Sequence, residues 1–143
     1  MLLKDKTSII TGSSRGIGLS TLEVFLNNGS KVICCYRNTN DTFLKKIENL
    51  KKLFPNKIFE FNFDFSNEES VKEVALKITK NHNEIDILVN NAGSISTSSF
   101  LMTPLREIEK MHRVNFLNQM LFSQIIIKKM IKNKIGSIVN LAS

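Results

Sequence analysis

Short apolar runs alternate with stretches of helical spacing along the chain, and this alternation restricts the fold more than any other feature. The apolar runs predict five β-strands, at residues 7–11, 31–36, 57–63, 85–89 and 136–142. The stretches between them predict helices at 16–28, from a cap in 38–41 to Phe54, from a cap at Ser66 or Asn67 through Ile78, and at 105–133. Crossover helices between short apolar strands are typical of a parallel sheet that is covered on both faces.

This pattern predicts an α/β fold, a Rossmann-type doubly wound parallel sheet with strand order 3-2-1-4-5. We expect a ligand in the crevice above strands 1 and 4, where the strand order reverses. Because the 143 residues contain no internal repeat or linker, one domain is expected over residues 1–143, incomplete at its C-terminal end.

The sequence shows no membrane, secretion or metal signal. It has no run of about 18 apolar residues, which a transmembrane helix would need. The apolar stretch in the N-terminal segment MLLKDKTSII is too short for a signal peptide. We therefore expect a cytoplasmic protein with no membrane partner. A bond between the adjacent Cys34 and Cys35 would be strained, so both are expected to be reduced thiols buried in a strand. His82 and His112 lack the spacing of metal ligands, so no metal is predicted.

The formal net charge is +7. Basic charge can indicate a nucleic-acid partner. Here the lysines are spread over the polar faces of the predicted helices, which favours a solvated surface. Aromatic residues are not interleaved with them as in RNA-binding segments. No nucleic-acid partner is therefore expected.

A glycine-rich loop joins the first predicted strand to the first predicted helix. In TGSSRGIG, Gly12, Gly16 and Gly18 follow a G-x3-G-x-G spacing. Glycine permits positive φ and a close approach of the backbone to a ligand, and the helix N-terminus offers N–H groups to a phosphate. The loop lacks the Gly-Lys-Ser/Thr of a P-loop, which argues against nucleotide hydrolysis. This context predicts a dinucleotide site, and the alternative is a tight turn without a ligand.

Three further segments carry a family resemblance. NNAG at Asn90–Gly93 follows the fourth predicted strand, FDFSN at Phe63–Asn67 ends the third, and VNFLN lies in the long predicted helix. Together with the glycine loop, they resemble the short-chain dehydrogenase/reductase family over about Lys6 to Ser143. Within the family, the chain looks most like 3-oxoacyl-acyl-carrier-protein reductases. The resemblance implies an NAD(P)-dependent oxidoreductase that acts on a small-molecule or acyl-carrier-bound carbonyl or alcohol, as a homo-oligomer.

The resemblance also implies the site residues. The cofactor-binding matches are Gly12, Ser14, Arg15, Gly16, Ile17, Gly18, Arg37, Asp64, Phe65, Asn91, Ala92 and Gly93. Asp64 matches an Asp that the family places near the adenine, and the NNAG segment borders the cofactor. A simple Asn-rich turn is the alternative for that segment. The catalytic matches are Asn115, in a water-mediated proton relay, and Ser143, whose hydroxyl would donate to the substrate oxygen.

The end of the second predicted strand bears on the choice of cofactor. An acid there usually selects NAD by binding the ribose hydroxyls. Here Tyr36 takes that place and Arg37 follows it, while Arg15 lies in the glycine loop. Two guanidinium groups suit a 2′-phosphate, and the family uses basic residues at these two places for NADP. NADP(H) is therefore expected, with NAD(H) as the second option. The alternative is that both arginines are surface residues without a ligand.

Asn115 shares a helical face with Met111 and Phe122, so it is expected to be buried and hydrogen-bonded. The alternative to its relay role is an amide that closes a helix irregularity. The family's acid/base pair, a Tyr followed four residues later by a Lys, has no match, because the sole tyrosine, Tyr36, is followed at that spacing by Asn40. General acid catalysis contributes about 10²–10⁴-fold. We therefore expect an inactive fragment of a longer enzyme, and the alternative is a non-catalytic dinucleotide-binding or protein-interaction module.

Overall fold

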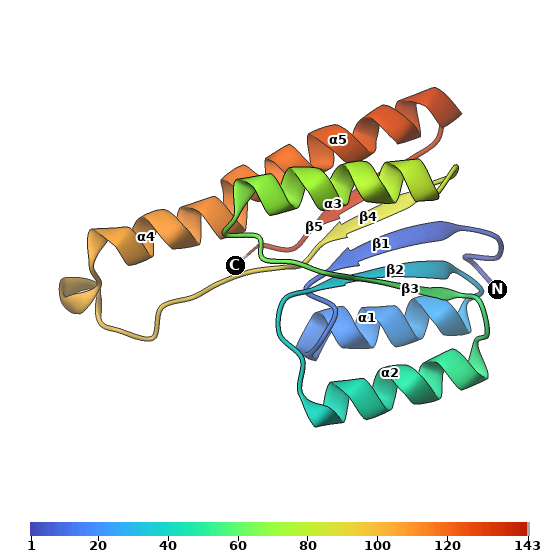
Figure 1. Cartoon of the computed structure of the whole chain (residues 1–143), viewed down its shortest axis with the longest axis horizontal. Coiled ribbons are helices and arrows are strands. Elements are labelled where there is room, and N and C mark those ends of the chain that lie inside the picture. Colours follow the sequence, from blue (N-terminus) through green and yellow to red (C-terminus); the bar gives the residue numbers. More distant parts are fainter. Residues whose placement is uncertain (143) are drawn as a thin grey trace.

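A computed structural model describes residues 1–142, in which a five-stranded parallel sheet lies between two layers of helices (Figure 1). The elements are β1 (Thr7–Thr11), α1 (Gly16–Asn27), β2 (Lys31–Tyr36), α2 (Asp41–Leu53), β3 (Ile58–Asn62), α3 (Glu68–Asn81), β4 (Ile87–Asn90), η1 (Phe100–Met102), α4 (Leu105–His112), η2 (Arg113–Leu117), α5 (Asn118–Asn133) and β5 (Ser137–Asn140). The strand order is β3-β2-β1-β4-β5, and all neighbouring pairs are parallel. This confirms the predicted fold class and strand order.

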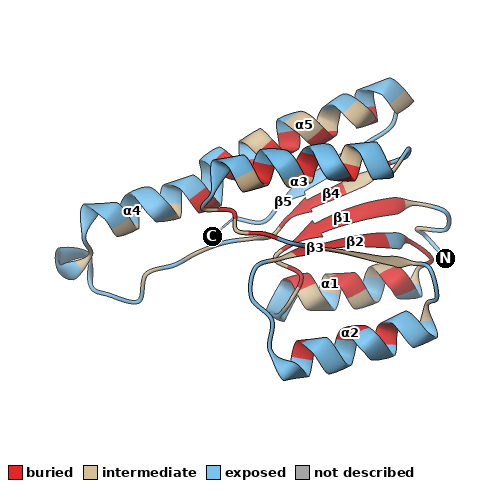
Figure 2. Ribbon diagram, viewed as in Figure 1, coloured by how far each residue is buried: buried red, intermediate tan, exposed pale blue. Residues whose placement is uncertain are grey.

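Each face of the sheet has its own apolar core. Helices α1 and α2 cover one face, and α3 and α5 cover the other (Figure 1). Since successive strand residues point to opposite faces, Ile9 packs in the α3–α5 core and Ile10 in the α1–α2 core. Cys34 and Cys35 divide in the same way, and both are buried free thiols, as predicted. The central strand β1 is buried along its whole length (Figure 2).

The ends of the elements follow local capping. The side chain of Asn40 accepts from Phe43 N at 2.8 Å at the start of α2. Asn67 does the same for Ser70 N at 3.0 Å, so Asn67 rather than Ser66 caps α3. The three later strands, β3, β4 and β5, are shorter than the apolar runs that predicted them, and β4 ends one residue later than predicted, at Asn90.

The single helix predicted over 105–133 is wrong. The π-helical turn η2 divides this stretch into α4 and α5. A π-turn takes up an extra residue, and here it leaves Val114 and Asn118 buried while Asn115 is exposed. The expected burial of Asn115 is therefore also wrong. No residue of α4 is buried, and this helix extends beyond the sheet (Figure 1).

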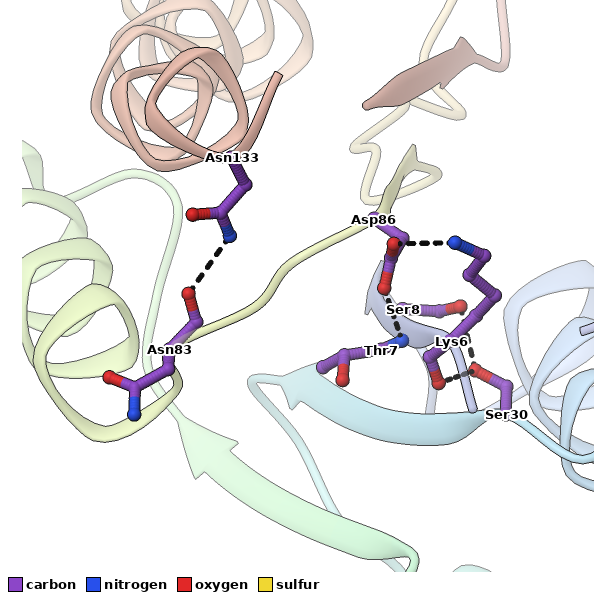
Figure 3. A network of polar contacts seen from close by, with 7 residues as sticks. All are labelled: Lys6, Thr7, Ser8, Ser30, Asn83, Asp86 and Asn133. Carbon is purple, nitrogen blue, oxygen red and sulfur yellow. Dashed lines mark hydrogen bonds and ion pairs between the residues drawn. The ribbon is translucent and has the colours of Figure 1, made fainter. Parts of the chain in front are cut away.

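Asp86 joins three strands at the end of the sheet opposite to the glycine loop. Its Oδ2 accepts from Thr7 N at 2.8 Å, and its Oδ1 accepts from Lys6 Nζ at 2.9 Å (Figure 3). Its backbone N–H donates to Thr7 O and its carbonyl accepts from Ser137 N, both at 2.8 Å. One residue thus aligns the starts of β1, β4 and β5.

Replacing Asp86 with alanine is expected to lower the free energy of unfolding by about 1–3 kcal/mol, because the buried Thr7 N–H loses its acceptor. Asp86→Asn keeps an acceptor and should lower it less. Glu23→Gln weakens a partly exposed ion pair with Lys46 and serves as the control, with little expected change. Urea denaturation followed by circular dichroism measures all three. Equal stability of the Asp86→Ala and Glu23→Gln variants would contradict the alignment role.

Strand β5 forms one edge of the sheet, and its four residues are all exposed. Within residues 1–142, it pairs with β4 alone. No helix in this part of the chain is long and apolar enough to cross a membrane. Over the same described residues, no three His, Cys, Asp or Glu side chains gather in a way that could hold a metal ion.

Candidate functional site

A cleft of about 490 Å³ opens at the carboxyl ends of the strands. The segments that follow β1, β2, β3 and β4 border it, so it extends further than the predicted crevice above strands 1 and 4. The sequence-predicted residues that line it are Gly12, Ser14, Arg15, Gly16, Ile17, Arg37, Asp64, Phe65, Asn91, Ala92 and Gly93. The remaining member of the predicted cofactor set, Gly18, is buried in the first turn of α1.

The glycine loop brings the N-terminus of α1 to the cleft. Gly12 and Gly16 have φ of +66° and +52°, a left-handed conformation that favours glycine. Arg15 precedes α1 without a capping hydrogen bond from its side chain, and no acidic residue lies in the first turn. The first N–H groups of a helix lack intrahelical partners. This end of α1 therefore presents N–H donors and a positive dipole end, which suit a phosphate.

Gly18 keeps the loop closed against the end of β4. A Cβ at this position would overlap the carbonyl oxygen of Gly12 and lie 2.5 Å from Asn91 Nδ2. The Asn91 amide itself donates to Thr11 O at 3.0 Å and to Gly12 O at 3.1 Å. Gly18 thus acts on the shape of the cleft rather than by lining it, and the Asn91 side chain holds the loop.

Thr11 is a site residue that the sequence reasoning missed. Its Oγ1 accepts from the backbone N–H groups of Asn91 and Ala92, both at 2.9 Å, and donates to Val89 O at 3.3 Å. The side chain is completely buried. Within a β-branched strand, a threonine looks like any other strand residue. Its position directly before the glycine loop is the only signal that could have indicated this role.

Asn115 binds the loop that follows NNAG. Its Oδ1 accepts from Ser94 N at 2.7 Å, and its Nδ2 donates to Ser94 O at 2.8 Å. The expected hydrogen bonding of Asn115 is therefore confirmed, although the residue is exposed. These bonds come from η2, the helix irregularity that the sequence left open as the alternative. A proton-relay role for Asn115 stays a prediction.

Two buried amides beside Asn115 were also missed. Asn118 Nδ2 donates to Phe65 O at 2.6 Å, and Gln119 Nε2 donates to Ala92 O. These carbonyls belong to the segments that follow β3 and β4, so the start of α5 holds two walls of the cleft. Their spacing was the signal, since residues three and four positions after Asn115 would share a face with it on a regular helix, although Asn115 itself is exposed.

The end of the cleft that follows β2 and β3 contains Tyr36, Arg37 and Asp64. The Tyr36 hydroxyl donates to Glu60 Oε1 at 2.9 Å. Partial burial, together with this hydrogen bond and the Glu60 charge, raises the pKa of Tyr36. Arg37 Nη1 lies 3.6 Å from Asp64 Oδ2. Tyr36 therefore takes the place of an acid at the end of β2 and holds its hydroxyl towards β3.

Asn90 links β4, α5 and β5 beneath the cleft. Its Nδ2 donates to Ser123 Oγ at 2.9 Å and to Asn140 Oδ1 at 2.8 Å. Its buried Oδ1 has no hydrogen-bond partner among the residues described. Ser143, the other predicted catalytic residue, lies outside the described residues, so its placement relative to Asn115 stays a prediction.

The sequence agrees with this geometry. The family model for short chain dehydrogenases matches residues 6–143. The chain belongs to the short-chain dehydrogenase family. The chain is 34% identical to the 3-oxoacyl-[acyl-carrier-protein] reductase FabG of Aquifex aeolicus, over 99% of this chain and 56% of that protein. It is 30% identical to a 3alpha-hydroxysteroid dehydrogenase of Mediterraneibacter gnavus, over 100% of this chain and 57% of that protein.

A crystal structure of a short-chain dehydrogenase from Streptomyces avermitilis has a TM-score of 0.86 and 25% identity, and the match covers 100% of this chain and 51% of that one. The chain thus spans about half the length of the curated relatives described above. Its relatives are oxidoreductases, and members of the family bind NAD(P). The cleft suits the phosphates of such a dinucleotide, because the N-terminus of α1, without a side-chain cap or an acidic residue in its first turn, lies at it. The predicted family is confirmed, while the roles of the individual site residues stay predictions.

Proposed function

We propose that this member of the short-chain dehydrogenase family is an NADP(H)-dependent oxidoreductase that transfers a hydride to or from a carbonyl or alcohol. We further propose that residues 1–143 form the cofactor-binding part of a longer protein. The observation that carries the cofactor assignment is the position of two arginines, Arg15 and Arg37, along the cleft at the uncapped N-terminus of α1. The residue at the end of β2 supports it, since Tyr36 replaces the acid that would select NAD.

Each wall of the cleft has a role in this proposal. The N–H groups at the start of α1 bind the pyrophosphate, and the two guanidinium groups bind the 2′-phosphate. Asp64 and Phe65 border the adenine, and Asn91–Gly93 border the rest of the cofactor. NADP(H) supplies or accepts the hydride. The chain's own residues bind and orient the reactants around it.

The catalytic proton requires a donor near the substrate oxygen. Tyr36 does not serve, because its hydroxyl donates to Glu60. We propose that Ser143 orients the substrate oxygen, that Asn115 supports a proton relay, and that a Tyr–Lys pair in the longer protein completes the site. The substrate is a small-molecule or acyl-carrier-bound carbonyl compound, which the similarity to FabG supports. Exposed apolar residues on α4 and η2, such as Leu105 and Phe116, support homo-oligomer formation.

The purified chain is expected to bind NADPH at least about tenfold more tightly than NADH, because one charge-assisted contact to the 2′-phosphate is worth about 1.4 kcal/mol or more. Titration followed by nicotinamide fluorescence measures both affinities. The same sample is expected to show no turnover of a ketone. A sample that is folded by circular dichroism and binds neither cofactor would contradict the assignment, and equal affinities would contradict the preference for NADP(H).

A further inference from the structure

Arg37 does not face the cleft alone. Its Nη1 lies 3.6 Å from Asp64 Oδ2, and both residues line the cleft. The two come from different elements, since Arg37 follows β2 and Asp64 follows β3. Their ion pair therefore lies beside the place where a 2′-phosphate would bind Arg37.

Each residue of the ion pair is also held by a hydrogen bond to a residue outside the pair. Asp64 Oδ1 accepts from Ser66 N at 2.8 Å, which leaves Oδ2 on the side of Arg37. The backbone carbonyl of Arg37 accepts from Asn62 Nδ2 at 2.8 Å. Asn62 thus anchors the Arg37 backbone independently of Asp64. Loss of the Asp64 charge would leave this anchor in place.

The contact between Arg37 and Asp64 is an electrostatic attraction rather than a directional hydrogen bond. At 3.6 Å, it is longer than a hydrogen bond of about 2.7–3.2 Å, so the guanidinium donors stay available. Partial burial opposes ionisation of Asp64, but hydrogen bonds from Ser66 and the charges of Arg37 and Lys110 outweigh it and lower the pKa of Asp64. The carboxylate is therefore fully charged at neutral pH. A 2′-phosphate that binds Arg37 meets this negative charge at close range.

We propose that Asp64 is a specificity-determining residue whose carboxylate partly cancels the charge of Arg37 and so limits the preference of the cleft for a 2′-phosphate. This inference rests on the proposed assignment of NADP(H). It gives Asp64 a role beyond bordering the adenine. The exposed position of the pair supports it, because the side chains of Arg37 and Asp64 are 48% and 38% exposed, so a 2′-phosphate can reach Arg37 while the carboxylate stays beside it.

Two nucleotides that differ only in the 2′-phosphate test the proposal, adenosine 2′,5′-bisphosphate and 5′-AMP. Isothermal titration gives the ratio of their Kd values, in which the adenine contacts cancel. Asp64→Asn is expected to raise the preference for the bisphosphate about three- to eightfold at low salt, as one charge several ångströms away would do. The gain should shrink at about 1 M salt. Glu68→Gln, which removes a carboxylate from the first turn of α3, is the control and should leave the ratio unchanged.

Arg37→Met provides the second arm. In that background, the gain from Asp64→Asn should be much smaller, whereas an equal gain in both backgrounds would overturn the role of the ion pair. An unchanged or lower ratio in Asp64→Asn would overturn the proposal, and Asp64→Ser, which keeps an oxygen for Ser66 N, repeats the measurement if the Asn variant does not fold. A different result is that the wild type binds the two nucleotides equally, with a ratio of Kd values that Arg37→Met does not alter. That result would overturn the NADP(H) assignment and this inference together. A wild-type preference that depends on Arg37 but not on Asp64 would overturn this inference alone.

Discussion

Replacing Gly18 with alanine is expected to abolish dinucleotide binding and to lower the free energy of unfolding by about 3 kcal/mol. The added Cβ would overlap the Gly12 carbonyl and crowd the Asn91 amide, which itself holds the loop. The Gly12 carbonyl is backbone, and the end of the Asn91 side chain is held by its hydrogen bonds to Thr11 O and Gly12 O, so the loop must shift away from β4. NADPH titration and urea denaturation measure the two losses.

Gly93→Ala is the matched control for this prediction. A Cβ at Gly93 would meet Asn115 Oδ1 at 3.7 Å, an ordinary van der Waals contact. The free energy of unfolding should therefore stay close to that of the wild type. If Gly18→Ala proves as stable as Gly93→Ala and still binds NADPH, the close packing of the glycine loop against β4 does not shape the cleft.

Removing both arginines, in Arg15→Ala/Arg37→Ala, is expected to weaken NADPH binding about 100-fold, since each charge-assisted contact contributes about 1.4 kcal/mol. NADH has no 2′-phosphate, so its affinity should change little. The expected result is the loss of discrimination rather than the loss of binding. Titrations of the two cofactors under the same salt conditions measure it, because screening alters both charges.

Lys45→Ala/Lys52→Ala is the control, since it removes the same net charge from exposed positions on α2. It should leave the ratio of the two affinities unchanged. If NADPH and NADH weaken together in the arginine variant, the guanidinium groups bind a part that the two cofactors share. The NADP(H) preference would then need another origin.

The fold was predictable because its signals are local and repeated. Five apolar runs with crossover helices leave few arrangements other than a parallel sheet, and the glycine loop marks the strand at which the order reverses. The break at η2 was not predictable in this way. A single extra residue rotates the face of a helix by about 100°, but apolar residues recur throughout 105–133, so the stretch reads as one helix.

In the candidate site, too, the residues found from the sequence have local signals and the residues missed do not. Residues that line the cleft lie in short motifs, and all but Gly18 of the predicted cofactor set reach it. Residues that hold the cleft in shape are long-range partners: Thr11 bonds residues 80 and 81 positions away, and Asn118 bonds Phe65 across 53. No local spacing encodes such pairs. Asn115 was found by its motif, but its exposure depends on the π-turn.

Cys34 and Cys35 are separate chemical probes of the opening of the two helical layers of this protein. They are neighbours in β2, yet Cys34 packs under α1 and α2 while Cys35 packs under α3 and α5. Burial raises the pKa of both thiols, so neither is a reactive thiolate while its layer is closed. A thiol reagent therefore modifies Cys34 when the α1–α2 layer separates from the sheet and Cys35 when the α3–α5 layer does. The order in which a thiol reagent modifies the two cysteines therefore shows which helical layer separates from the sheet first.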